Sequence, residues 1–148
     1  MAFTGGQGAP VAVTKVETRM LPQEDDKKVK PHFIIHVKNA GNGEVIDPSK
    51  IEVACKSEAL DYKDFNTIIV SASLSGTPLR CSEDIGAVPG PVTVRLRDKE
   101  DLIRCTYDKD NGIDAGLDAY IAPLKVELDY GYTFTISKNI IIEKILTY

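Results

Sequence analysis

Apolar and polar residues alternate with a period of two along most of this chain. In the segment 33–37, Phe33, Ile35 and Val37 share one parity. In the longest run, 124–136, every even-numbered residue is apolar or aromatic. Successive side chains of a β-strand point to opposite faces, so this alternation predicts half-buried strands. The periodicity of a helix is almost absent.

Clusters of turn residues separate the alternating runs, and 56–66 is the one segment in which we expect a helical turn. The runs predict strands over 11–19, 33–39, 51–56, 67–72, 77–81, 92–97, 102–107, 124–136 and 139–146. Short strands joined by polar turns predict an all-β fold, an immunoglobulin-like antiparallel β-sandwich of about 7–9 strands. Its inward-facing residues should include Phe33, Ile35, Val37, Val92, Val94, Val126 and Leu128.

The length of 148 residues fits one domain better than two. Residues 1–10 carry no charged side chain and are predicted to form a flexible tail, which leaves 11–148 as a single domain. No apolar stretch approaches the ~20 residues that a membrane-spanning helix needs. We therefore expect membrane attachment only through a segment absent from this chain.

The charge pattern argues against a nucleic-acid partner. The net charge is −4, from 22 acidic and 18 basic residues. The basic residues are scattered, whereas nucleic-acid binders usually carry a basic patch or stripe.

Three cysteines, Cys55, Cys81 and Cys105, fall on predicted strands, and their parity points all three inwards. A disulfide between Cys81 and Cys105 is favoured, because these residues lie on separate strands that can meet inside a sandwich. Other pairings and three free thiols are the alternatives. Closing such a loop would stabilise the fold by ~3 kcal/mol.

The segment 108–116 is acidic and invites comparison with a calcium-binding loop. Asp108, Asp110, Asn111 and Asp114 all carry oxygen ligands. An EF-hand loop has glycine at its sixth position and glutamate at its twelfth. Here Gly112 comes one residue early and the glutamate is missing. The alternatives are a noncanonical calcium site and an ordinary acidic loop, and no other cofactor is indicated.

The sequence contains few candidate catalytic residues. The chain has two histidines, His32 and His36, which share one strand parity and are expected on the outward face. No Ser-His-Asp or Cys-His arrangement can be assembled from motifs. We predict that the chain is not an enzyme.

The C-terminal run Ile140, Ile141 and Ile142 is apolar on both faces, unlike the other predicted strands. A strand of this kind should be covered on both faces. One hypothesis is that the strand 139–146 packs against a neighbouring copy or domain. The alternative is that the N-terminal tail covers Ile141.

The segment 13–45 contains a strand followed by Asn39-Ala40-Gly41-Asn42-Gly43. This pattern resembles the opening of the CARDB-type, immunoglobulin-like modules of archaeal cell-surface and exported proteins. In such a corner Gly41 and Gly43 can adopt positive φ, and Asn39 can bond its own turn. The three cysteines and the long acidic loop depart from the family. The resemblance implies a fold and a surface location but no site.

Together these observations predict a non-catalytic, extracytoplasmic structural or adhesive module, a unit of a surface protein or filament. Its partner would be protein, including a second copy of itself. The alternative is a ligand-binding β-sandwich domain that uses the 108–116 loop, with or without calcium.

Overall fold

A computed structural model describes residues 9–22, 28–56, 58–82, 88–114 and 122–144. Most of these residues lie in strands, and the only α-helix among them has five residues. The elements in chain order are β1 (Val11–Pro22), β2 (Lys28–Asn39), β3 (Glu44–Ile46), η1 (Pro48–Lys50), α1 (Ile51–Cys55), η2 (Tyr62–Asp64), β4 (Thr67–Leu74), β5 (Thr77–Pro78), β6 (Val92–Arg95), β7 (Glu100–Thr106), η3 (Lys109–Asn111), β8 (Ile113–Asp114), β9 (Leu124–Asp129) and β10 (Gly131–Thr133).

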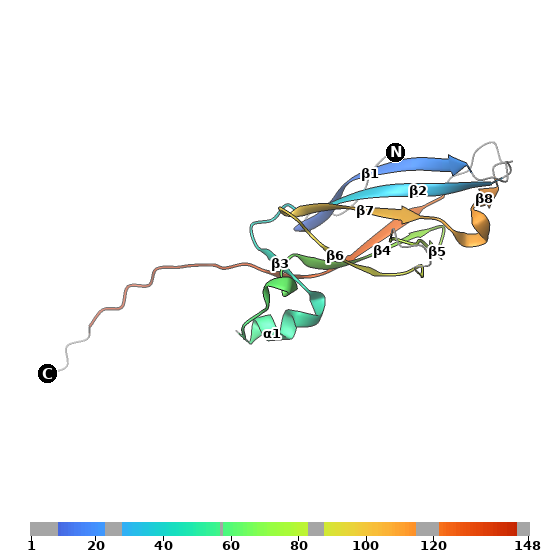
Figure 1. Cartoon of the computed structure of the whole chain (residues 1–148). Coiled ribbons are helices and arrows are strands. Elements are labelled where there is room, and N and C mark those ends of the chain that lie inside the picture. The colour runs from blue at the N-terminus through green and yellow to red at the C-terminus, as the bar shows by residue number, and fades with distance from the viewer. Residues whose placement is uncertain (1–8, 23–27, 57, 83–87, 115–121, 145–148) are drawn as a thin grey trace.

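The strands form two antiparallel sheets that pack face to face (Figure 1). One sheet has the order β1-β2-β7, with β8 paired to the start of β2. In the other sheet, β4 is central, with β5 and β6 on one side and β9 on the other. A separate pair, β3 and β10, lies at one end. The predicted β-sandwich is confirmed.

The core lies between the two sheets and consists mainly of β-branched residues. In β2, Phe33, Ile35 and Val37 are buried, as their parity predicts. The other four residues predicted to face inwards are half-buried and pack against this core: Val92, Val94, Val126 and Leu128. The predicted facing is therefore confirmed, although these four lie on edge strands that leave them partly uncovered.

The predicted strand at 51–56 is wrong, because residues 51–55 form α1, directly after η1. Pro48 occupies the first turn, and the Asp47 carboxylate accepts a hydrogen bond of 2.9 Å from the Ser49 backbone N–H. A capping aspartate followed by proline is a helix-start signal, which the alternation of apolar residues concealed. Cys55, predicted to face inwards, is an exposed free thiol at the end of α1.

The run 124–136 does not form one continuous strand. β9 ends at Asp129, and the chain resumes at Gly131 as β10, paired to β3 instead of β4. A Cβ atom on Gly131 would lie 2.6 Å from Cγ1 of Ile46, so only glycine allows this close approach. The strand predicted to continue to residue 136 therefore ends earlier, at Thr133.

The corner after β2 forms as expected in one respect and differently in another. The Asn39 side chain accepts a hydrogen bond from the Gly41 N–H at 3.1 Å and donates one to the Gly43 carbonyl at 3.2 Å. Gly41 and Gly43, however, do not have positive φ. Their role is steric, because a Cβ atom on either would overlap Tyr132.

Candidate assembly surface

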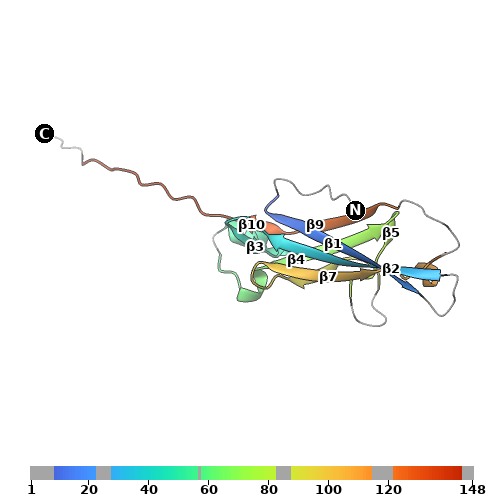
Figure 2. The ribbon, with the colours of Figure 1, turned by 90° about the horizontal axis from the view of Figure 1, so that it is seen from above.

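The residues that follow β10 leave the domain as an extended segment. Figures 1 and 2 show this segment, residues 134–144, running away from the sandwich. Its isoleucines are almost fully exposed: Ile140 by 77%, Ile141 by 88% and Ile142 by 90%. Phe134 and Ile136 are exposed as well. The predicted strand 139–146 is therefore unpaired over 139–144, and residues 145 and 146 lie outside the described residues.

The base of this C-terminal segment is firmly attached to the domain. β10 pairs with β3 up to Thr133, which lies opposite Glu44. The Tyr132 hydroxyl accepts a hydrogen bond of 2.5 Å from the Gly43 backbone N–H. The segment therefore starts from a defined point at the end of the sandwich where β3 and β10 lie.

The described part of the domain leaves the three isoleucines exposed. The sequence left open whether the N-terminal tail covers Ile141. That tail, predicted over 1–10, falls largely on residues 1–8, which lie outside the described residues. The 88% exposure of Ile141 leaves its apolar surface open for a partner.

The disulfide between Cys81 and Cys105 is confirmed. It links the segment that follows β5 with strand β7. Beside it, the backbones of Arg80 and Thr106 exchange hydrogen bonds of 2.9 and 3.0 Å. The Arg80 guanidinium forms an ion pair with Asp108 and donates a hydrogen bond of 2.8 Å to the Ser82 carbonyl. The segment 79–82 is thus fixed along the outer edge of β7.

The acidic loop is held by basic side chains. Asp108 forms ion pairs with Arg80 and with Lys30, whose ammonium lies 3.3 Å away. Burial opposes ionisation of Asp108, but the hydrogen bonds from Arg80 and Lys30 outweigh it and lower its pKa. The backbone carbonyl of Asp110 accepts a hydrogen bond from Lys28.

Asp108 thus has a structural role, because its carboxylate pairs with Arg80 and Lys30. Asp114 is exposed in β8, where it lies opposite Lys28. Within the described ranges, which stop at 114 in this loop, no three His, Cys, Asp or Glu side chains lie close enough to hold a metal ion. The structure describes the backbone of Asn111 in η3, between Asp110 and Gly112. Residues 115 and 116 of the predicted loop lie outside the described residues.

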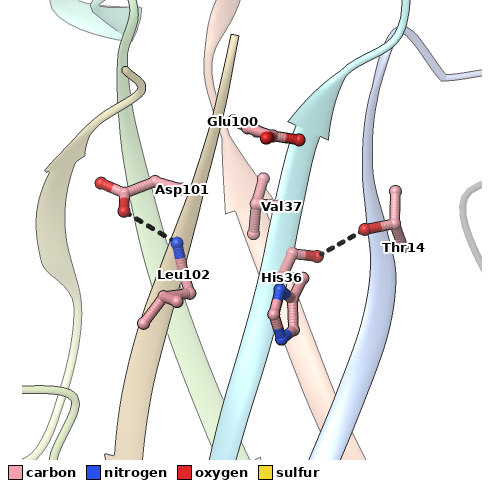
Figure 3. Close-up of a pocket in the computed structure, with 6 residues that line it drawn as sticks. All are labelled: Thr14, His36, Val37, Glu100, Asp101 and Leu102. Atoms are coloured by element: carbon pink, nitrogen blue, oxygen red, sulfur yellow. Dashed lines mark hydrogen bonds between the residues drawn. The ribbon is translucent and has the colours of Figure 1, made fainter. Parts of the chain in front are cut away.

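A shallow pocket of about 240 Å³ lies beside β1, β2 and β7 (Figure 3). Thr14 donates a hydrogen bond of 3.4 Å to the His36 carbonyl, and Asp101 accepts one of 2.8 Å from the Leu102 N–H. The His36 ring lies 3.4 Å from Glu17. Each of these polar groups contacts a residue of an adjacent strand or the next residue in sequence. The pocket is therefore part of the outer surface of the sheet.

His32 lies on the same outward face, as its parity predicts. Its Nδ1 is 2.8 Å from the Thr106 hydroxyl. Partial burial lowers the pKa of His32, and the positive charges of Arg104, Arg19 and Arg80 lower it further. The two histidines contact different neighbouring strands, His32 contacting β7 and His36 contacting β1.

The chain matches no known protein-family model, and comparison with curated proteins and with solved structures finds no similar chain. The resemblance to CARDB-type modules therefore stays a prediction. Among the described helices, none is long and apolar enough to cross a membrane.

Proposed function

We propose that this domain is a non-catalytic structural module that acts outside the cytoplasm and assembles through its C-terminal segment. The observation that carries the proposal is the exposure of Ile140, Ile141 and Ile142 on an extended segment attached to a folded sandwich.

The exposed isoleucines provide the free energy for association. Burying one isoleucine side chain contributes ~1.5–3 kcal/mol. Ordering the segment opposes this gain, since fixing each residue costs ~1–2 kcal/mol, so association also needs the hydrogen bonds that a paired strand makes. An extended apolar strand is also a form that pairs readily with the edge of another sheet. Association with protein is therefore the function that this geometry supports best.

The disulfide supports an extracytoplasmic location. Disulfides persist in oxidising compartments and are rare in the cytosol of most organisms. Here the bond links two residues of the buried core, Cys81 and Cys105, and thus contributes to the stability of the fold.

Sedimentation velocity over a range of concentrations tests the proposal. The wild-type chain should form oligomers, and the pair Ile140→Lys/Ile142→Lys should sediment as a folded monomer. Val88, which is 85% exposed elsewhere on the domain, provides the matched control Val88→Lys, which should assemble like the wild type. Wild-type protein that is monomeric at every concentration would refute the proposal.

A further inference from the structure

Over the residues that the structure describes, the sandwich is open along one side, between β1 and β9. Figure 2 shows these two edge strands at the same margin of the molecule. The Gly41 corner confirms their proximity at one end, because its closest neighbours are Pro10, just before β1, and Tyr132, just after β9. Among the described strands, β1 pairs with β2, β9 pairs with β4, and none joins β1 to β9.

The inward-facing residues at this opening are incompletely covered. In β9, Leu124, Val126 and Leu128 are half-buried, although their partners on β4 are buried. In β1, Val13 and Val16 are likewise half-buried, opposite fully buried residues of β2. We call these five residues the open edge: Val13, Val16, Leu124, Val126 and Leu128.

The opposite side of the sandwich is better closed. There the segment 79–82 lies beside β7, held by the disulfide and by the backbone hydrogen bonds between Arg80 and Thr106. The inward-facing Ile103 and Cys105 of β7 are buried. The shallow pocket of about 200 Å³ that remains, beside Val94 and Leu102, is smaller than a strand.

The C-terminal segment has the pattern that the open edge requires. Phe134, Ile136, Ile140 and Ile142 share one parity, so an extended chain presents them on one face, which Lys138 interrupts between Ile136 and Ile140. Residues 134–144 span ~36 Å when extended, whereas the six residues of β9 span ~20 Å. The segment is therefore long enough to leave its own domain and to line the whole of a neighbour's β9.

The segment is poorly suited to folding back onto its own edge. It contains no glycine or proline between Tyr132 and Lys144, and its residues of the turn-forming kinds are Ser137 and Asn139. Its base points away from the sandwich, because β10 pairs with β3 up to Thr133. A second copy of the chain is therefore the occupant that this geometry favours.

Resting on the proposed function, we infer that the C-terminal segment of one copy enters the open edge of the next and pairs with β9 there. Ile140 and Ile142 then pack between the two sheets of the neighbour, while Ile141 lies on the outer face. Each copy donates one segment and accepts another at a different surface. Such a head-to-tail contact does not close on itself in general, so it builds a filament.

Disulfide trapping between two variants tests this docking. Both carry Cys55→Ser to remove the exposed thiol. The donor carries Ile142→Cys. The acceptor carries Leu124→Cys, Val126→Cys or Leu128→Cys in turn, together with Ile140→Lys and Ile142→Lys so that it cannot donate. At least one β9 position should give a cross-linked dimer on mild oxidation. Circular dichroism checks that each variant is folded.

Two matched controls set the background for the cross-linking. A donor with Ile141→Cys presents its thiol on the other face, and an acceptor with Val94→Cys presents one on the opposite side of the sandwich. Both should give at least several-fold less product. Equal trapping with these controls, or no trapping at β9 between chains that associate in sedimentation, would overturn the docking while leaving assembly intact. Wild-type protein that never associates would overturn both.

Discussion

Removing the bond between Cys81 and Cys105 should destabilise the domain substantially. The bond closes a loop of 25 residues, since the two cysteines are separated by 24 positions. In the chain-entropy model, a loop of this length restricts the unfolded chain by about 12 cal/mol/K, which is ~3.5 kcal/mol at 25 °C. With an m-value of ~2 kcal/mol/M, the urea midpoint should fall by ~2 M.

Urea unfolding with and without reductant measures this effect. The measurement belongs in the Ile140→Lys/Ile142→Lys background, because association would add to the apparent stability. Reduction isolates the cross-link, whereas Cys81→Ala/Cys105→Ala also removes buried sulfur atoms and should cost more. Cys55→Ser, which alters only the exposed thiol, should respond to reductant like its parent. A loss below ~1 kcal/mol on full reduction would refute the reasoning.

Two further predictions concern the contacts around β7 and β10. Asp108→Asn removes the ion pairs with Arg80 and Lys30 and should cost about 1 kcal/mol at neutral pH. Folding lowers the pKa of Asp108, so its contribution to the free energy of unfolding is complete above the unfolded pKa, 3.8, and is lost as pH falls through the folded pKa. The stability of the variant should therefore fall less steeply with decreasing pH than that of the parent. Tyr132→Phe leaves the Gly43 N–H without its acceptor and should cost about 1 kcal/mol in urea unfolding, whereas Tyr62→Phe, at an exposed position, should be neutral. An unchanged midpoint for Tyr132→Phe, or equal acid sensitivity for Asp108→Asn, would contradict these contacts.

The sequence by itself determined the class of fold and the facing of its strands. A period of two depends only on local backbone geometry, so Phe33, Ile35 and Val37 could be assigned to the core without knowing their partners. The same parity brought Cys81 and Cys105 to the interior, where the structure joins them. The sequence also shows the apolar run at 140–142, whose covering on both faces stays a prediction.

Parity failed where local signals competed with it. Ile51, Val53 and Cys55 alternate like a strand, but the Asp47-Pro48 start initiates η1 and α1, which leaves Cys55 exposed. The glycines at 41 and 43 were expected to provide positive φ. Their actual role is to make room for Tyr132, which lies 89 residues beyond Gly43 in the chain and cannot be inferred from the local sequence.

Only the tertiary structure decided where strands end and which edges stay open. The alternation from 124 to 136 is continuous, yet pairing to β4 stops at Asp129, two residues before β4 begins, and the chain then pairs with β3 until β3 itself begins opposite Thr133. Ile140, Ile141 and Ile142 therefore lie outside the sandwich, and among the described strands none joins β1 to β9. Side-chain alternation records which face a residue presents, whereas the identity of a neighbouring strand depends on contacts between residues far apart in the chain.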